Sequence, residues 1–339
     1  MTDVKVLEKK ESGFAKIQLA TEDVRVIVTT VGCQIASVFT KDKDGEWGDI
    51  VLAPQDLEHP ELDSAFMGAV VGRVGNRIGG ASFELNGKTY TLAKNNGEHC
   101  LHGGIKGFNQ KIFDYEIIPD GVRFSCESPD MEEGFPGCVQ FTVTVTLVGN
   151  EMSLIYGAES DADTLFAVTN HSYFNLSCKN QPIFDHSLKM ASDSFMVVDP
   201  SGIVTGETAS SAGTPFDFSE RRVIGQLDLE GCQDLKNVGG YDHPIVFNAS
   251  EDQIELSYEP NGRVVKISTD CPMVHMYTGN FLGGGVIGKL GVPYDNWCGI
   301  ALETEGCPDS IHVEKEPSVI LRKGEKYASV TKYTFEVMK

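Results

Sequence analysis

Turn dipeptides between strand-like runs constrain the fold of this chain more than any other feature. Asn-Gly or Asp-Gly joins two such runs in FELNGKTYTL (83–92), FDYEIIPDGVRFSC (113–126) and IELSYEPNGRVVKIST (254–269). These dipeptides readily adopt the positive φ angles that two-residue hairpin turns require. FTVTVTLVGN (141–150) alternates apolar residues with threonine, as a half-buried strand does, and stops at Gly149. The pattern predicts antiparallel strands joined by short turns.

Helical signals are weak by comparison. No stretch keeps a 3.6-residue apolar period over several turns. AFMGAVVGRVGNRI (65–78) is the one candidate for a short helix, although its glycines weaken it. No repeat, linker or charge block marks a domain boundary. We therefore expect an all-β protein, a large antiparallel β-sandwich with few short helices, that forms a single domain over residues 1–339.

Composition limits the partners and the compartment. The formal net charge is −21, which argues against nucleic acid and anionic membranes because both select basic patches. No apolar run is long enough to span a bilayer, and the first residues lack the apolar core of a signal peptide. The nine cysteines include no CxxC pair, so we expect free thiols in a reducing, cytoplasmic compartment.

Two motifs resemble ligand sites but carry little weight by themselves. GGGVIG (283–288) matches G-x-G-x-x-G, yet Gly and Pro follow it where a dinucleotide site needs a helix, so we expect a loop. His99 and His102 lie in a turn-rich loop, and no cysteine or carboxylate cluster at ligand spacing accompanies them. Each is either a surface histidine or one held close to a ligand by the neighbouring glycines.

A polar row ends the strand-like segment DTLFAVTNHSYFNL (163–176). Its aromatic and β-branched residues predict a strand, on which alternate side chains share a face. One face begins with Leu165 and Ala167 and then becomes a row of hydrogen-bonding groups that includes His171 and Tyr173. Such a row on an otherwise apolar strand raises the question of what it faces.

Charged residues in two further segments have two readings each. In GIALETEGCPDS (299–310), a strand would place Glu303 and Glu305 on one face, about 7 Å apart. They form either a solvated edge or a pair of acidic groups in a site. In GRVGNRIGG (72–80), Arg73 and Arg77 either satisfy backbone carbonyls or offer donors to a polyhydroxylated or anionic ligand.

Together these segments resemble the aldose 1-epimerase (galactose mutarotase) family. The matching segments are, in order, GRVGNRIGG, NNGEHCLHGGIKGF, SPDMEEGFPG, TNHSYFNL, TPFDF, GYDHPIVF, YTGNF and ALETEGCPDS. They keep the family's order from about residue 66 to the end of the chain. The resemblance implies a galactose mutarotase-like β-sandwich with an open sugar cleft that needs no cofactor and no metal. It also implies an isomerase of hexose metabolism that interconverts the α and β anomers of free galactose and glucose.

The same resemblance implies roles for particular residues. Glu303 would be the catalytic base and His171 the catalytic acid. This pair suits the reaction, because ring opening removes the proton from the C1 hydroxyl while the ring oxygen is protonated. His102 would orient the sugar near its ring oxygen. The implied hydroxyl-binding residues are Asn76, Arg77 and Asp242.

Three positions depart from the common family pattern. His275 stands where a sugar-contacting glutamine is usual, and we expect it to contact the sugar and influence substrate preference. Glu305 replaces a glutamine two residues after the base, and Phe113 stands where tryptophan is commoner. The proposed acid and base are retained, so the reaction class is expected to hold.

The sequence is also compatible with three rival functions. A non-catalytic sugar-binding protein would need the hydroxyl-binding groups but not the acid–base pair. A hexose 6-phosphate 1-epimerase should show basic residues at its cleft. A glycosidase would use Glu303 and Asp242 as paired carboxylates and would release free sugar from a glycoside.

Overall fold

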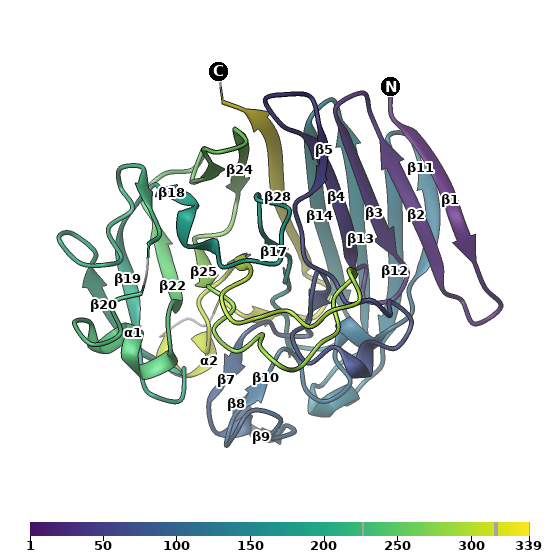
Figure 1. Ribbon diagram of the computed structural model, residues 1–339. Coiled ribbons are helices and arrows are strands. Elements are labelled where there is room, and N and C mark those ends of the chain that lie inside the picture. Colours follow the sequence, from purple (N-terminus) through teal and green to yellow (C-terminus); the bar gives the residue numbers. More distant parts are fainter. Residues whose placement is uncertain (226, 315–317, 339) are drawn as a thin grey trace.

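Three antiparallel sheets dominate the protein (Figure 1). The computed structural model describes residues 1–225, 227–314 and 318–338. The five-stranded sheet contains, in spatial order, β1 (Asp3–Lys9), β2 (Ala15–Ala20), β3 (Val24–Thr29), β4 (Ile35–Lys41) and β5 (Trp47–Asp49). The nine-stranded sheet has the order β11 (Asp114–Ile118), β12 (Gly121–Ser128), β13 (Val139–Val148), β14 (Glu151–Ser160), β28 (Lys326–Val337), β24 (Arg263–Thr269), β23 (Ile254–Tyr258), β18 (Ser187–Met190) and β21 (Arg222–Val223). The six-stranded sheet has the order β17 (Tyr173–Phe174), β26 (Ile300–Glu305), β25 (Met273–Tyr277), β22 (Asp242–Phe247), β19 (Ser192–Val198) and β20 (Val204–Ser210).

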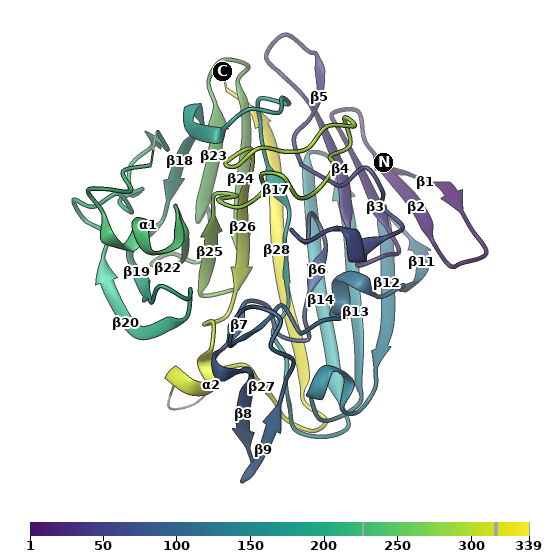
Figure 2. The ribbon, with the colours of Figure 1, turned by 60° about the horizontal axis from the view of Figure 1, so that its bottom comes forward.

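Shorter elements complete the chain. The two-stranded pairs are β8 (Ser82–Leu85) with β9 (Lys88–Thr91), β7 (Arg77–Ile78) with β10 (Cys100–Leu101), β6 (Val70–Val71) with β16 (Thr169–Asn170), and β15 (Thr164–Leu165) with β27 (Ile320–Leu321). The described chain has two short α-helices, α1 (Gln233–Val238) and α2 (Ser310–Val313). The β8–β9 hairpin projects at one end of the molecule, close to α2 (Figure 2). Neither helix has the length and apolar character that crossing a bilayer would require.

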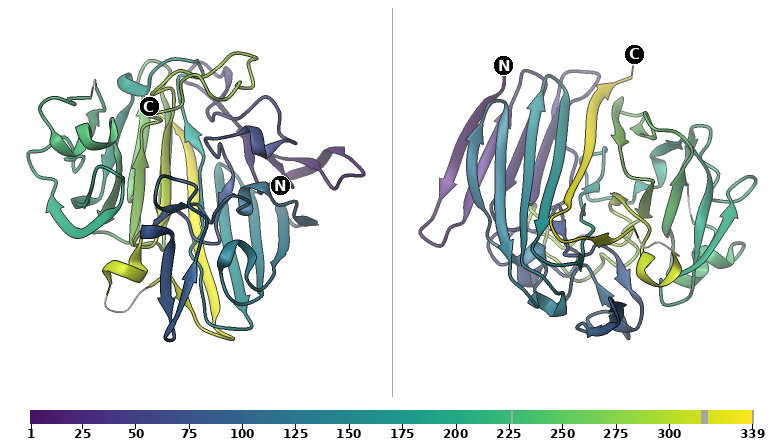
Figure 3. Two further views of the ribbon diagram at one scale, coloured as in Figure 1. Left: turned by 90° about the horizontal axis from the view of Figure 1, so that it is seen from below. Right: turned by 180° about the vertical axis from the view of Figure 1, so that it is seen from behind.

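The nine-stranded sheet forms one layer, and the other two large sheets lie against it (Figures 1 and 3). One continuous cluster of buried side chains contains Val26 of β3, Val143 of β13 and Leu302 of β26. Between the six- and nine-stranded sheets, the ring centroids of Phe174 and Tyr333 are 5.8 Å apart. The sheets therefore share one core, and the predicted β-sandwich is confirmed.

The predicted hairpins are also confirmed. Asn86 and Gly87 have φ angles of 54° and 74° between β8 and β9. Asp120 turns the chain between β11 and β12 with a φ of 56°, and Gly262 turns it between β23 and β24 with a φ of 77°. Each turn thus uses the left-handed conformation that Asn, Asp and Gly tolerate best.

Two of the sequence-based expectations about local structure are wrong. Residues 65–78 form turns and the strands β6 and β7 instead of a helix. Residues 163–176 do not form one continuous strand but three two-residue pieces, β15, β16 and β17, which pair with β27, β6 and β26. The segment passes from one partner to the next, so no single neighbour supports a long strand. The motif at 283–288 lies in turns and bridges, as expected for a loop.

Candidate active site

A cavity of about 270 Å³ lies on the face of the six-stranded sheet that points away from the core. All seven residues proposed from the sequence line it: Asn76, Arg77, His102, His171, Asp242, His275 and Glu303. They come from β7 and the residue before it, β22, β25, β26, the turn after β10 and the link between β16 and β17. Segments far apart in the sequence therefore meet at one site.

Strand β26 presents its two carboxylates on the site face. Ile300 and Leu302 enter the core, whereas Glu303 and Glu305 alternate with them on the other face. Both are buried, with 1% and 4% of their surface exposed, so they do not form a solvated edge. In the antiparallel register, Glu303 is directly opposite His275 of β25.

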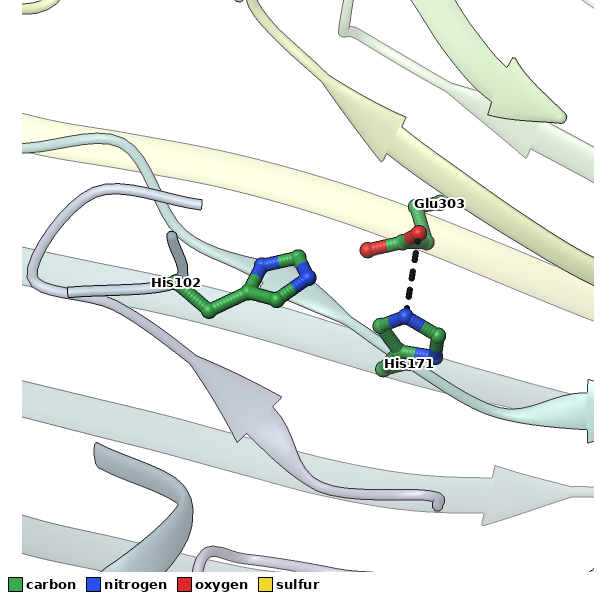
Figure 4. A group of neighbouring side chains, drawn as sticks. All are labelled: His102, His171 and Glu303. Atoms are coloured by element: carbon green, nitrogen blue, oxygen red, sulfur yellow. Dashed lines mark ion pairs between the residues drawn. The ribbon is translucent and has the colours of Figure 1, made fainter. Parts of the chain in front are cut away.

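His171 is fixed by the chain just before β6. Its backbone N–H donates to the carbonyl of Ala69, and its carbonyl accepts from the N–H of Gly68, each at 2.9 Å. This clamp directs the imidazole toward β26, where Nε2 lies 3.4 Å from Oε1 of Glu303 (Figure 4). His171 and Glu303 thus form a buried imidazole–carboxylate pair beside the cavity.

Burial moves the proton affinities of this pair in opposite directions. It lowers the pKa of His171 to about 4. Burial, followed by repulsion from Glu305, raises the pKa of Glu303 well above its usual value. Both shifts favour the uncharged form of each group. Between the two groups, these shifts favour a proton on the carboxyl group over one on the imidazole, whereas a base at Glu303 and an acid at His171 require that proton on the imidazole.

His102 is held in a defined tautomer. Its Nδ1 accepts a hydrogen bond from the backbone N–H of Asn76 at 3.1 Å, so a neutral ring carries its proton on Nε2. Burial lowers the pKa of His102 well below its usual value, which keeps the ring neutral. The turn that carries His102 requires a glycine at the next position, because Gly103 has a φ of +86° and a Cβ there would lie 1.9 Å from the carbonyl oxygen of Gly72. His102 therefore offers a hydrogen-bond donor to the site.

This tautomer also weighs against a metal centre. The potential ligand atoms of His102, His171 and Glu303 lie within 4.8 Å of one another, which is close enough for a shared ion. However, a histidine binds metal through an unprotonated nitrogen, and Nδ1 of His102 is already occupied by the N–H of Asn76. The three residues suit proton transfer and hydrogen bonding better than metal binding.

A chain of hydrogen bonds runs along the cavity wall from Asp242 to Glu305. Nε2 of His275 lies 2.5 Å from Oδ1 of Asp242. The amide nitrogen of Asn76 lies 3.0 Å from Nδ1 of His275 and 3.0 Å from Oε1 of Glu305. Both amide hydrogens of Asn76 and both ring nitrogens of His275 are thus engaged within the protein. Direct contact of either side chain with a sugar hydroxyl would require exchange of one of these partners.

Asp242 is the ionised member of the group. Burial by itself would raise its pKa, but the charge of Arg77 and the hydrogen bond from His275 hold the pKa below its usual range. Arg77 approaches Oδ2 of Asp242 at 3.4 Å, and its Nε donates to Oδ1 of Asn96 at 3.1 Å. A charged carboxylate and a guanidinium at a cavity wall are suitable partners for hydroxyl groups.

Arg73 has a structural role: of the two alternatives for this residue, it satisfies backbone carbonyls and does not bind a ligand in the cavity. Its guanidinium is buried and donates to the backbone carbonyls of Ser128, Pro129, Pro136 and Gly137 at 2.8–3.1 Å. Burial lowers its pKa to about 10. It therefore ties the loop before β13 to the segment before β7 and does not reach the cavity.

Four aromatic residues also line the cavity: Phe66, Tyr173, Tyr277 and Phe281. Tyr173 belongs to the polar row of residues 163–176, whereas the other three were not proposed from the sequence. Tyr173 and Tyr277 lie two residues after His171 and His275, so strand alternation carried a signal for both. Phe66 and Phe281 lie in turns, where no periodicity indicates a direction. His99 contacts Ser201 through Nε2 at 3.0 Å and is absent from the cavity wall.

Comparison with known proteins gives a consistent result. The sequence model of the family described as aldose 1-epimerase matches residues 15–334. The chain is 39% identical to galactose mutarotase of Bos taurus over 326 residues, covering 95% of this chain and 94% of the relative. It is 34% identical to aldose 1-epimerase of Escherichia coli K12 over 314 residues, covering 90% of each. A solved structure of an aldose epimerase homologue from C. elegans superposes with a TM-score of 0.87 at 28% identity, covering both chains completely.

Proposed function

The chain belongs to the aldose 1-epimerase family, and we propose that it interconverts the α and β anomers of free hexoses such as galactose and glucose. The main support for this function is the buried pair of His171 and Glu303 at the wall of a cavity lined with hydrogen-bonding groups. Nε2 of His171 lies 3.4 Å from Oε1 of Glu303. A buried carboxyl group and an imidazole in reach of each other at a cavity wall are typical of general acid–base catalysis.

In this mechanism, Glu303 takes the proton from the C1 hydroxyl while His171 gives a proton to the ring oxygen. The C1–O5 bond breaks, the C1–C2 bond of the open aldehyde rotates, and the ring oxygen attacks the opposite face of C1. His171 then takes back its proton and Glu303 returns one to the new C1 hydroxyl. The pair holds one proton before and after the cycle, so no cofactor is consumed.

The reacting form has its proton on the imidazole, an arrangement that the burial of the two groups disfavours. A bound sugar would change this balance by bringing a hydroxyl to the carboxylate and a ring oxygen to the imidazole. The Nε2–H of His102 would donate a hydrogen bond near the ring oxygen, as the resemblance implies. The Asp242–Arg77 pair binds hydroxyls farther along the ring.

The rival functions have less support. A sugar phosphate needs a cationic subsite, yet among the described residues that line the cavity Arg77 is the sole arginine or lysine, and it contacts Asp242. In a glycosidase, Asp242 would be the free carboxylate of the pair, but its two oxygens are already engaged by His275 at 2.5 Å and Arg77 at 3.4 Å. A non-catalytic sugar-binding protein would have no use for the close pair of His171 and Glu303.

We also propose a reducing, cytoplasmic compartment, supported by nine cysteines that all lack a disulfide partner.

The direct test of the function is polarimetry of freshly dissolved α-D-galactose and α-D-glucose. The optical rotation should reach its equilibrium value faster with the protein than with buffer alone, and the initial rate should rise in proportion to protein concentration. Equal rates with and without protein, for both sugars, would reject the proposal. Release of free sugar from a galactoside or glucoside would instead indicate a glycosidase.

A further inference from the structure

The segment between β5 and β6 supports the two histidines of the site. Ser64, Ala65 and Phe66 line the cavity, and the clamp on the backbone of His171 comes from the next residues, Gly68 and Ala69. The position of this segment therefore determines where both the wall and one proposed catalytic group lie.

The buried carboxylate of Asp63 holds that segment through hydrogen bonds to its backbone. It is 8% exposed, and its Oδ1 accepts the N–H of Ala65 at 3.0 Å while its Oδ2 accepts the N–H of Met67 at 2.7 Å. The two oxygens thus hold the residues directly before and after Phe66. Burial raises the pKa of Asp63 to about 6, and the backbone donors oppose that rise, so the carboxylate is ionised at neutral pH.

Phe66 needs this support. Its φ angle is +56°, a conformation that is unfavourable for a bulky side chain. In this conformation its ring centroid lies 4.8 Å from that of His102, with an edge-on angle of 64°, and 6.1 Å from that of His171. The two imidazole centroids are 5.3 Å apart. One phenyl ring therefore contacts both histidines and helps to bury them.

We propose that Asp63 is a positioning residue, whose carboxylate holds Phe66 against the rings of His102 and His171 through the N–H groups of Ala65 and Met67. Asp63 touches neither substrate nor reacting atoms. It affects the orientation of the His102 and His171 rings and the exclusion of water from them. Its contribution to the reaction rests on the proposed function, whereas its effect on the histidine rings does not.

The test compares Asp63→Asn with Asp56→Asn. Asparagine keeps one acceptor oxygen at position 63 but places an NH₂ group against the second N–H donor, so one of the two hydrogen bonds is lost. Asp56 is a matched control because it lies on the same connection and accepts the backbone N–H of Glu58 at 2.9 Å, but it is exposed, its other oxygen contacts His59, and it is absent from the wall of the proposed active site. We expect Asp63→Asn to lower kcat roughly 10- to 100-fold, as misplacement of catalytic groups does, with a smaller change in KM. Asp56→Asn should keep wild-type values.

A spectroscopic measurement separates positioning from general damage. Proton NMR signals of the His102 and His171 rings should move in Asp63→Asn, because the ring current of Phe66 changes. The signal of His312, which contacts Asp309 elsewhere in the chain, should stay in place. These signals remain readable if the protein shows no mutarotase activity, so the two proposals fail separately.

A double-mutant cycle with Phe66→Leu identifies the route. If Asp63 acts through Phe66, Asp63→Asn combined with Phe66→Leu should lose about as much kcat as the worse single variant. A folded Asp63→Asn with unmoved histidine signals would overturn the proposal. A double variant whose loss of kcat equals the product of the two single losses would also overturn it. If Asp63→Asn does not fold, unmoved His102 and His171 signals in Phe66→Leu would overturn it instead.

Discussion

Glu305→Gln should move the acidic limb of the kcat/KM–pH profile to lower pH. Glu305 lies two residues from Glu303 on the same face of β26, and both carboxyl groups are buried. Burial raises the pKa of Glu305 to about 7. Repulsion from Glu305 is, after burial, the largest cause of the raised pKa of Glu303. Removing the neighbouring charge should therefore make Glu303 easier to ionise.

Strand geometry gives the size of the effect. Residues i and i+2 of a strand are about 7 Å apart. Two unit charges at that distance, with an effective dielectric constant of about 20, repel by about 2.4 kcal/mol. At 1.36 kcal/mol per pKa unit this corresponds to about 1.7 units. Because the two carboxyl groups titrate together, part of this shift is distributed between them, and we expect a displacement of about 1 to 2 pH units.

The assay is polarimetry at subsaturating galactose between pH 4 and pH 9. Glutamine keeps an acceptor oxygen for the amide of Asn76, which donates to Oε1 of Glu305 at 3.0 Å, so the packing behind the cavity is preserved. Glu207→Gln, on the exposed part of β20, removes the same charge at a distance and should leave the profile unchanged. Coincident acidic limbs for wild type and Glu305→Gln would refute the reasoning, and equal displacement in both variants would indicate a net-charge effect.

Three further predictions address the proposed site and its support. Glu303→Gln and His171→Asn should each lower kcat/KM in polarimetry by at least about 100-fold with unchanged circular dichroism, and the double variant should lose little more than either single one; retention of activity within a few-fold would exclude the assignment. His275→Gln should raise KM and alter the galactose-to-glucose ratio of kcat/KM, because Asp242 loses its partner at 2.5 Å; an unchanged ratio would show that His275 does not influence discrimination. Arg73→Met should lower the free energy of unfolding by about 3 kcal/mol or more, since several buried carbonyls lose their donor; a Tm equal to that of wild type would contradict this.

The sequence carried most of the fold because its signals are local. Asn86-Gly87 and the alternation from Phe141 to Leu147 indicate hairpins and a strand face without reference to the rest of the chain. The segment 163–176 was misjudged because its three pieces pair with strands that lie far away in the sequence. Alternation within β26 gave the shared face of its carboxylates, but it contains no information on whether that face meets water or a cavity.

The site was foreseen as a set of residues but not as a network. Resemblance to a family placed seven residues in the cavity, whereas the hydrogen bonds of His275 to Asp242 and Asn76 depend on strand register and on a loop. Asp63 and Phe66 were not singled out because their contribution comes from an irregular segment with a left-handed residue. Such geometry follows from tertiary packing and has no periodic signature.

The position of β28 has a consequence for synthesis on the ribosome. This strand follows every other described strand in the chain, yet it lies in the middle of the nine-stranded sheet, between β14 and β24. The two halves of that sheet therefore stay unjoined while residues 326–337 are still inside the exit tunnel, and their edges at β14 and β24 remain open to other chains during that interval. Arrested chains that end before Lys326 should accordingly be cleaved by protease faster than released chains, which limited proteolysis of stalled complexes would measure.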